Sequence, residues 1–304
     1  MRFKGLDLNL LIALDLLLEE QNVTRAAERM HVGQSAMSAA LARLRLHFAD
    51  DLLIISGRRM MPTALAESLR QPLREAILQI ETVVGIEREF VPSRSTRHFR
   101  VEMPDHLVPV LLPQLTRRLA ADAPQILLDI RPPSRDPTPS LHKGELDLVV
   151  TPSIYSDPNY VSETLLTNEL VVTGWRDNPA LSEQPDLPTL LSLQQVIVKS
   201  DRVRLGSLLN EEQLALYLGA GRTALIAPNF SCIPPCLIGT NRISLLYREL
   251  AKLAAREFPL AIWEVPLAMP SMVEVMMFHP MRRQDGGLVW LREQLSQAAA
   301  EIGS

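Results

Sequence analysis

Aromatic residues, cysteines and net positive charge are all in short supply in this chain of 304 residues. Phe, Trp and Tyr together make up 5% of the sequence, so the cores must be built mainly from Leu, Ile, Val and Ala. The only two cysteines, Cys232 and Cys236, are too few for a disulfide framework, which favours a reducing compartment. A net charge of −4 and a pI near 5.9 argue against a uniformly basic nucleic-acid binder. Any contact with DNA therefore requires a local basic patch.

Signatures of catalysis and of membrane insertion are missing as well. The sequence has no Walker loop, no G-x-G-x-x-G, no G-x-S-x-G and no H-E-x-x-H. The apolar stretch over residues 6–18 is interrupted by Asp7, Asn9 and Asp15, and no small-residue cleavage site follows it. It is neither a signal peptide nor a membrane span. We therefore expect a cytoplasmic protein that is not an enzyme and holds no cofactor or metal.

The length suits two or three domains, and a composition of 47% hydrophobic and 22% charged residues is that of a globular protein. Leucines recur at helical spacing over residues 6–20, which predicts a first helix that ends near Gln21 and Asn22. Thr24 fits the N-cap of a second helix. The buried face of that helix would hold Ala26, Ala27 and Met30.

A third helix is predicted from Gln34 to about Phe48, after a short turn over residues 30–33. Its buried face is expected to carry Ala36, Met37, Ala40, Leu41 and Leu44. The opposite face is small and polar, which leaves room for a partner to approach closely. It consists of Gln34, Ser35, Ser38, Ala39, Ala42 and Arg43.

A hairpin over residues 52–61, with residues 57–59 at its tip, and a long helix from residue 63 to about 87 follow. One apolar stripe runs along the long helix through Leu65, Leu69, Leu73, Ile77, Ile80 and Val84. Nothing else in the N-terminal segment is left to cover this stripe, which indicates that a second copy of the chain packs on it. Pro72 lies inside the helix and is expected to kink or locally open it.

The rest of the chain alternates strand-like and helix-like segments, which predicts two α/β lobes with parallel sheets. Strands are expected near residues 99–103, 126–130, 146–150, 170–174, 196–199, 224–227, 243–245 and 273–278. Helices are expected near residues 107–121, 139–143, 207–217, 247–258 and 286–300. The last strand and the last helix are expected to return to the first lobe.

Residues 23–38, VTRAAERMHVGQSAMS, resemble the helix-turn-helix of LysR-type transcriptional regulators. The opening LDLNLL (residues 6–11) and the run LRLHFADDLL (44–53) are similar to one subgroup, which contains the rhizobial nodulation regulators and the salicylate-responsive regulators of aromatic degradation. APNF (227–230) and VWLR (289–292) also resemble that subgroup. The resemblance thus spans nearly the whole chain.

The resemblance implies an α/β protein with an N-terminal winged helix-turn-helix, a long linker helix and a two-lobed, periplasmic-binding-protein-like effector domain. Residues 1–62 would bind DNA, 63–90 would form the linker (dimerisation) helix and 91–304 the effector domain. Lobe one would comprise 97–166 and 271–304, and lobe two 167–270. The implied partners are operator DNA, an aromatic or carboxylate inducer, further copies in a homodimer or homotetramer, and RNA polymerase if the protein is an activator.

The third predicted helix is the element expected to enter a major groove. There an amide side chain can pair with adenine, and a serine can bind a base or a phosphate. Residues 25–59 contain six arginines and only three acidic residues, Glu28, Asp50 and Asp51. The overall pI conceals this local excess of positive charge. The alternative is that this face and these charges are merely solvated. The candidate DNA-binding residues are Thr24, Arg25, Gln34, Ser35, Ser38, Ala39, Arg43, Arg58 and Arg59.

Ligands of α/β sheets bind beyond the carboxyl ends of strands and at domain interfaces. That rule selects polar and aromatic residues after the predicted strands of both lobes. They are Asp105, His106, Thr151, Ser153, Lys199, Ser200, Asn229, Phe230 and His279. Lys199 and the histidines can hold a carboxylate or phenolate, and Phe230 can cover an apolar ring. Each of them can equally be an ordinary residue at a strand end.

Two other functions remain open from the sequence. Two-lobed α/β folds also host catalysis, so a metabolic enzyme with an accidental helix-turn-helix is one alternative. A regulator that responds to redox state through Cys232 and Cys236 is the other. Pro234 and Pro235 between these cysteines disfavour a regular helix, and no histidine pair lies nearby, so the spacing itself indicates no metal site.

Overall fold

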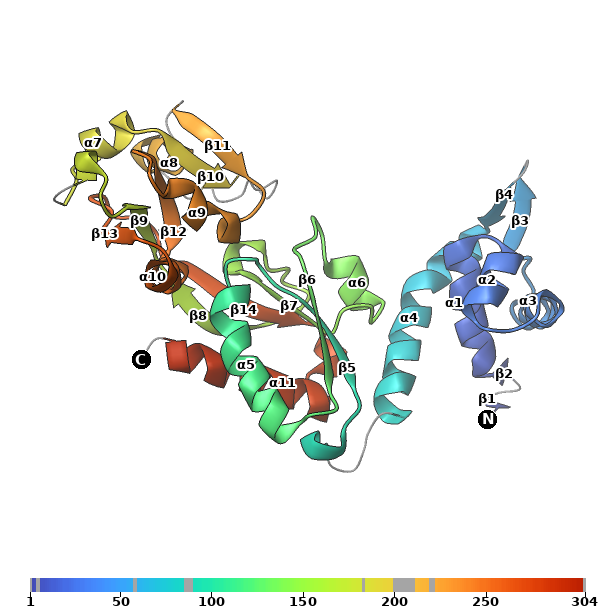
Figure 1. Cartoon of the computed structure of the whole chain (residues 1–304). Coiled ribbons are helices and arrows are strands. Elements are labelled where there is room, and N and C mark those ends of the chain that lie inside the picture. The colour runs from blue at the N-terminus through green and yellow to red at the C-terminus, as the bar shows by residue number, and fades with distance from the viewer. Residues whose placement is uncertain are drawn as a thin grey trace. The chain divides into compact units, whose positions relative to one another are not determined.

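The computed structural model describes residues 2–3, 6–56, 59–84, 90–181, 184–198, 211–218 and 222–302. The chain divides into two compact units, Met1–Ile86 and Glu87–Ser304 (Figure 1). Within the described ranges, no helix is long and apolar enough to cross a membrane.

Three short helices, a hairpin and one long helix make up the first unit. Its elements are β1 (Arg2–Phe3), β2 (Leu6–Asp7), α1 (Asn9–Glu20), α2 (Val23–Arg29), α3 (Gln34–Phe48), β3 (Leu53–Ser56), β4 (Arg59–Pro62) and α4 (Ala64–Val84). Because Leu6 and Asp7 pair with Phe3 and Arg2, the first helix begins later than predicted. Leucines of α1 pack with Ala26 and Ala27 of α2 and with Met37, Leu41 and Leu44 of α3.

The apolar stripe of α4 is partly covered by its own chain. Leu73 is 6% exposed, and Leu69 and Ile77 pack against the same core as α1. Arg74 Nε also lies 3.1 Å from Asp15 Oδ1 of α1. The prediction that nothing in the N-terminal segment covers this stripe is therefore wrong at Leu69, Leu73 and Ile77. The helix runs through Pro72 without interruption.

Lobe one is built on the sheet β6-β5-β7-β14-β8. Its elements are β5 (His98–Glu102), α5 (Val108–Asp122), β6 (Leu127–Arg131), α6 (Thr138–His142), β7 (Leu148–Pro152), β8 (Val161–Asn168), β14 (Met272–Phe278) and α11 (Gly286–Ile302). The helices α5 and α11 pack side by side (Figure 1). They cover a core of Phe99, Val101, Leu111, Leu115, Phe278, Leu291 and Leu295.

Lobe two is built on the sheet β11-β10-β12-β9-β13. Its elements are β9 (Leu170–Trp175), α7 (Leu187–Ser192), β10 (Gln195–Val198), α8 (Glu211–Leu218), β11 (Thr223–Ala227), α9 (Ile233–Leu237), β12 (Ile243–Tyr247), α10 (Arg248–Glu257) and β13 (Leu260–Trp263). Val110 of α5 packs into the core of this lobe beside Ile233 and Leu250, so the two lobes share apolar contacts.

Both sheets are mixed, which corrects the expectation of parallel sheets. In lobe one β14 runs antiparallel to β7 and β8, and in lobe two β9 runs antiparallel to β12 and β13. The strands β8 and β13 were not predicted. Because the chain crosses between the lobes twice, after β8 and before β14, a strand can enter each sheet against the direction of its neighbours. The expected fold class, a helix-turn-helix unit followed by a two-lobed α/β unit, is confirmed.

Candidate nucleic-acid interface and inter-lobe site

The helix α3 presents one face of small and polar side chains to solvent. Gly33 supplies its N-cap in an extended conformation and no side-chain acceptor. Met37, Leu41 and Leu44 hold the opposite face in the core. Ala36, predicted to be buried, is exposed, which corrects that prediction. The exposed face consists of the six residues expected there, Gln34, Ser35, Ser38, Ala39, Ala42 and Arg43.

The N-cap of α2 is Asn22, which corrects the prediction of Thr24. The Asn22 backbone is extended, and its Oδ1 accepts a hydrogen bond from the backbone N–H of Arg25 at 3.1 Å. Asn and Thr are both good N-caps, and the capping residue lies outside the helical backbone, so the helix begins immediately after Asn22. Thr24 is instead an exposed residue of the first turn.

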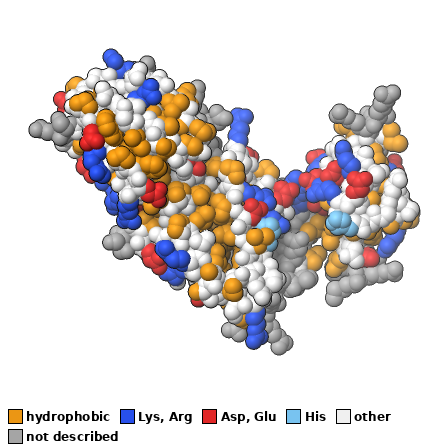
Figure 2. All heavy atoms as spheres, in the orientation of Figure 1, with side chains coloured by type: hydrophobic (Ala, Val, Ile, Leu, Met, Phe, Trp, Pro, Cys, Tyr) orange, Lys and Arg blue, Asp and Glu red, His pale blue; other side chains and the backbone are white. Residues whose placement is uncertain are grey.

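Three of the six arginines in the predicted basic patch are engaged within the first unit. Arg25 lies 3.0 Å from Glu20, and Arg29 contacts both Glu19 and Glu20. Arg45 donates to the backbone carbonyls of Asp51 and Leu53 and so ties α3 to the hairpin. Figure 2 shows acidic and basic side chains intermixed on the visible face of this unit. The local basic excess is therefore smaller than the count of arginines predicts.

Arg43 is the predicted phosphate contact that remains open. It is exposed on the same face as Ser38 and Ala39, and no ion-pair partner for it is found within the described ranges. Arg58 lies outside the described residues, as does the side chain of Arg59 at the start of β4. The arginines at the tip of the hairpin therefore remain a prediction.

Sequence reasoning missed the polar group that fixes the hairpin to α4. Thr63 Oγ1 donates to Asp50 Oδ1 at 2.6 Å and accepts from the backbone N–H of Ala66 at 3.1 Å. Asp50 Oδ1 also accepts from the N–H of Leu52. A threonine just before a helical segment is an N-cap signal, but its long-range partner is not encoded in the local pattern.

The two lobes meet at a polar contact made by Asp105. This residue follows β5 of lobe one, and its carboxylate accepts hydrogen bonds from the backbone N–H groups of Phe230 at 2.6 Å and Ser231 at 3.2 Å. Both donors belong to the 3-10 helix η5 (Phe230–Cys232) of lobe two. We call this contact the latch. It joins two of the predicted ligand residues, Asp105 and Phe230.

Aromatic rings from both lobes surround the next residue, His106. Its ring stacks on Tyr247 of lobe two at a centroid distance of 4.0 Å, and Phe230 lies edge-on at 5.7 Å. His106 Nε2 lies 3.2 Å from Glu274 Oε1. Both His106 and Glu274 are almost completely buried. The inter-lobe site therefore combines stacked rings with one buried carboxylate, Glu274, and one half-buried carboxylate, Asp105.

Tyrosines contribute to the same site. Burial raises the pKa of Tyr247 well above its usual range, and Tyr217, Glu274, Tyr155 and Asp105 add to the shift. Burial and the nearby Tyr155 raise the pKa of Tyr217 to about 12. These phenols therefore stay neutral and keep an O–H donor at physiological pH. Sequence reasoning missed Glu274, near the beginning of β14, and Tyr155 and Tyr217, which lie in η2 (Ser153–Tyr155) and α8. It also missed Tyr247, the last residue of β12, because the predicted strand stopped at residue 245 and residue 247 was expected to begin a helix.

The structure separates His279 from the other predicted ligand residues, which corrects its assignment to the inter-lobe site. Because β14 runs antiparallel to β7, it begins at the end of the sheet where β7 finishes, with Glu274 beside Pro152. His279 follows its other end, where its ring lies near His142 and Tyr160. A parallel strand would have carried His279 to the site, and the antiparallel strand carries Glu274 there.

The remaining predicted ligand residues have varied surroundings. Thr151 is buried in β7, and Ser153 begins the short helix η2 (Ser153–Tyr155). Asn229 caps η5, since its Oδ1 accepts from the N–H of Cys232 at 3.0 Å. Lys199 and Ser200 lie outside the described residues.

Cys232 is exposed and Cys236 is half-buried, and both thiols are free. Cys236 Sγ donates to the backbone carbonyl of Cys232 at 3.3 Å. Among the residues that the structure describes, no group of three or more His, Cys, Asp or Glu side chains is arranged to hold a metal ion.

Two family descriptions match the chain, one for each unit. The first, "Bacterial regulatory helix-turn-helix protein, lysR family", covers residues 8–67. The second, "LysR substrate binding domain", covers residues 92–300. Together they extend over most of the sequence.

Similar proteins and structures agree with these matches. Nodulation protein D 1 of Bradyrhizobium sp. (strain NC92) is 37% identical over 305 residues, which cover 100% of this chain and 96% of that protein. Nodulation protein D 2 of Rhizobium tropici is 37% identical over 301 residues, covering 99% and 95%. A probable transcriptional regulator from Pseudomonas aeruginosa superposes with a TM-score of 0.60 at 27% identity, covering 96% of this chain and 97% of that one.

A crystal structure of full-length CbnR complexed with its target DNA has a TM-score of 0.51 at 16% identity, covering 97% of this chain and 100% of that one. At this identity the likeness concerns the fold alone.

Proposed function

The chain belongs to the LysR family of bacterial transcriptional regulators, and from this premise we propose which of its surfaces bind DNA, a signal molecule and a second copy of the chain. It is a DNA-binding regulator. The proposal assigns operator reading to the exposed face of α3, signal binding to the inter-lobe site, and self-association to α4 and the outer sheet edges.

Operator reading by α3 is supported by the exposure of six small or polar residues on one helix face. Gln34 at the first turn can pair with adenine through its amide, and Ser38 one turn later can reach a base or a phosphate. The small side chain of Ala39 lets the helix approach the groove floor, and Arg43 can contact a phosphate. Gly33 offers no side-chain cap, so the first-turn N–H groups of α3 stay available to a phosphate oxygen. Thr24, Arg25, Ser35, Arg58 and Arg59 complete the proposed interface.

The test is selection of duplex fragments from the organism's own genome by the purified full chain, followed by footprinting. Gln34→Ala and Ser38→Ala should each reduce discrimination between the selected site and random DNA, by about 1–3 kcal/mol where a good base contact is lost. Thr116→Ala in the second unit is a control that should bind as wild type does. If wild type selects no duplex, or both variants discriminate normally, the assignment of α3 fails.

Signal binding between the lobes is supported by the stack of His106 on Tyr247 with Phe230 at its edge. Rings offered by both lobes suit an aromatic molecule that fits between them. The carboxylates of Asp105 and Glu274 lie in the same site and would repel a ligand carboxylate. We therefore favour an aromatic ligand without a carboxylate. Thr151, Ser153, Ser200 and Asn229 are retained as flanking contacts.

The ligand class can be tested by calorimetry on the full chain with salicylate and with phenol as small probes. Phenol should bind and salicylate should bind at least several-fold more weakly, because two carboxylates repel an anion in a site of low dielectric constant. Phe230→Ala should abolish phenol binding and leave operator affinity unchanged. Tighter binding of salicylate, or no effect of Phe230→Ala, would contradict the proposed ligand class or its location.

Self-association is supported by apolar residues on two of the four outer strands in the sheets of the second unit. Leu127 on the edge strand β6 is 56% exposed, and Ile226 on the edge strand β11 is 55% exposed. Figure 2 shows hydrophobic side chains gathered on the visible face of this unit. Exposed edge strands with apolar side chains are rarely left uncovered. We propose that copies of the chain cover them in a homodimer or homotetramer, which sedimentation at micromolar concentration tests directly.

A further inference from the structure

The segment that follows the linker is fitted tightly against the beginning of α11. We call residues 90–97 the strap and residues Asp285, Gly286, Gly287 and Trp290 the socket. Phe90 lies on Trp290 at a ring-centroid distance of 5.6 Å. A Cβ added to Gly286 would come within 3.0 Å of Phe90 Cβ. A Cβ added to Gly287 would overlap Arg97 Nη1 and lie 3.1 Å from the Phe90 ring. A side chain at either position would therefore require Phe90 or Arg97 to shift.

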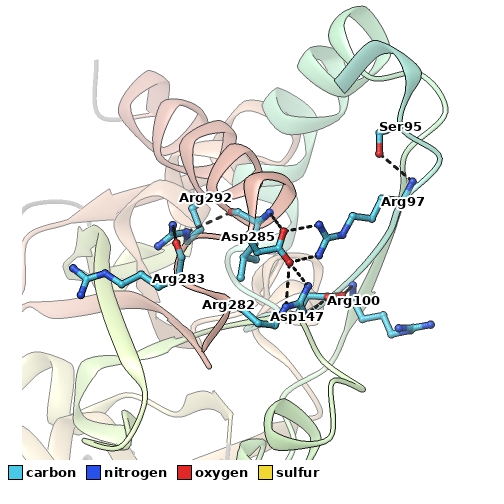
Figure 3. Close-up of polar contacts among 9 residues, drawn as sticks. Ser95, Arg97, Arg100, Asp147, Arg282, Arg283, Asp285 and Arg292 are labelled. Carbon is cyan, nitrogen blue, oxygen red and sulfur yellow. Dashed lines mark hydrogen bonds and ion pairs between the residues drawn. The ribbon is translucent and has the colours of Figure 1, made fainter. Parts of the chain in front are cut away.

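Charges fix the same segment from its other end (Figure 3). Arg97 donates from both guanidinium nitrogens to the two oxygens of Asp285, at 2.5 and 2.6 Å. A guanidinium that forms two parallel hydrogen bonds to one carboxylate is held in orientation as well as in position. The Arg97 guanidinium also lies 4.7 Å over the Phe99 ring. The strap is thus held at Phe90 by packing and at Arg97 by an ion pair.

Asp285 extends the attachment into lobe one. Its oxygens also accept from Arg282 and from the backbone N–H of Leu288, so the same carboxylate caps α11. Arg282 in turn donates to Asp147, whose other oxygen accepts from the backbone N–H of Arg100 in β5. Asp147 and Arg282 are nearly buried. Figure 3 shows the side chains of Arg97, Arg282 and Asp147 gathered around Asp285.

One strand connects this network to the inter-lobe site. β14 begins near Glu274, which contacts His106 at the site, and ends at Phe278. The short helix η6 (Pro280–Arg282) follows, and it carries Arg282 itself. β14 is paired with β7 and β8 on its two sides, so a continuous chain of contacts runs from Glu274 through β14 and η6 to Arg282, which binds Asp285, the partner of Arg97.

We propose that the strap and socket form the joint through which the state of the inter-lobe site reaches the DNA-binding unit. This inference rests on the proposed function, since it presumes a signal between the lobes and an output on DNA. The strap begins at Phe90, six residues after α4 ends at Val84, so it is the part of the second unit nearest in sequence to α4 for which contacts are described. In the latched state the socket holds the strap, and loss of the latch loosens it.

Hydrogen exchange in the full-length protein tests the joint without DNA and without a ligand. Phe90→Ala should raise amide exchange across residues 91–99 by about tenfold, because the segment then opens locally. Val91→Ala is the matched control, since its side chain is exposed on the same segment. Arg97→Lys is a second variant, which keeps the positive charge but cannot form the two parallel hydrogen bonds to Asp285. The amides of β12 report whether a variant remains folded, and unchanged exchange in the strap of both Phe90→Ala and Arg97→Lys overturns the proposal.

Coupling is tested by breaking the latch and measuring exchange at the strap. Asp105→Ala should raise exchange across residues 91–99 roughly threefold or more, whereas Asp122→Ala on the exposed end of α5 should not. In the Phe90→Ala background, Asp105→Ala should cause no further increase in amide exchange across the strap. The proposal is overturned if Asp105→Ala leaves amide exchange in the strap unchanged. It is also overturned if Asp105→Ala raises that exchange equally in the wild-type and Phe90→Ala backgrounds.

A second readout uses the duplex selected by the wild-type chain. Asp105→Ala should change the affinity for that duplex by roughly threefold or more, and Phe90→Ala should remove this difference. An Asp105→Ala effect of the same size in both backgrounds contradicts the proposal. Failure of wild type to select any duplex instead contradicts the proposed function, and the exchange measurements then decide on the joint by themselves.

Discussion

At the scale of single residues, the partner that a side chain already holds decides what it can offer to DNA. Arg25 and Arg43 look alike in the sequence, since both lie in the helix-turn-helix and both are exposed. Arg25 donates to the Glu20 carbonyl at 2.6 Å and pairs with its carboxylate, whereas Arg43 faces solvent beside Ser38. Their contributions to DNA binding should differ accordingly.

Arg43→Ala should weaken binding to all duplexes and reduce the slope of log affinity against log salt by about 1, as expected for one lost phosphate contact. Arg25→Ala should change the slope by less, because Glu20 already offsets the charge of Arg25. The measurement is a salt titration of operator affinity for wild type and both variants. Equal slopes for the two variants would show that the pairing with Glu20 does not persist on DNA.

Acid stability depends on Asp285. Burial opposes its ionisation, but the hydrogen bonds and charges of Arg97 and Arg282 outweigh burial and lower its pKa from 3.8 to about 2. A carboxyl whose pKa is lowered on folding stabilises the protein above its unfolded pKa, and this contribution is lost as the pH falls from about 4 to about 2. At neutral pH the contribution is about 2 kcal/mol.

Urea unfolding of wild type and Asp285→Asn, followed by tryptophan fluorescence, measures this contribution. The difference in unfolding free energy should be largest near neutral pH and should shrink as the pH falls below about 4. Asp122→Asn, which changes an exposed carboxylate, serves as the control. A difference that stays constant across the whole pH range would mean that Asp285 acts through its shape and not through its charge.

At the scale of elements, the sequence predicts helices better than it predicts what covers them. The period of 3.6 residues correctly placed α3 and its exposed face, because the period is a property of the local sequence alone. The same period revealed the stripe on α4 but not its neighbour. Leu73 packs on α1 of its own chain, and that contact depends on how the chain folds back across the 43 residues between the two helices.

This difference sets the test for self-association through α4. Leu73→Glu should destabilise the first unit itself by several kcal/mol, because it buries an unpaired carboxylate in the core. Ile80 is half-buried and lies outside that core cluster. Ile80→Glu should therefore leave the unit folded and weaken self-association. Circular dichroism and sedimentation of both variants separate the two effects, and an Ile80→Glu protein that associates like wild type would exclude this part of α4 from the interface.

Strand direction was the other property that local sequence could not supply. The segment 273–278 was recognised as a strand returning to the first lobe, and β14 is that strand. Its antiparallel direction follows from the second crossing between the lobes, which no local pattern encodes. The same error placed His279 at the inter-lobe site and overlooked Glu274. Asp105, His106 and Phe230 were grouped correctly because they follow strands whose direction was expected.

At the scale of the whole molecule, lobe one is assembled from two distant parts of the chain. β14 lies between β7 and β8, and α11 packs on α5, so the last third of lobe one is supplied by residues after 271. A chain that ends at residue 270 should keep a folded first unit and lose protection in β7 and β8. Hydrogen exchange on that truncated chain measures both, and protected β7 and β8 would contradict the central role of β14.

The position of β14 also determines what an interrupted gene would produce. Ribosomes release a chain from its N-terminus, and domains generally fold as they emerge. The DNA-reading unit is complete before any of lobe one has been made, whereas lobe one keeps two unpaired strand edges until residue 278 has emerged. A premature stop codon between residues 90 and 278 would therefore yield a product that retains the helix-turn-helix unit and lacks a complete lobe one. On the proposed function, such alleles would not behave as simple loss-of-function alleles. Their products would still bind operators or pair with intact copies, but they would not respond to the signal molecule.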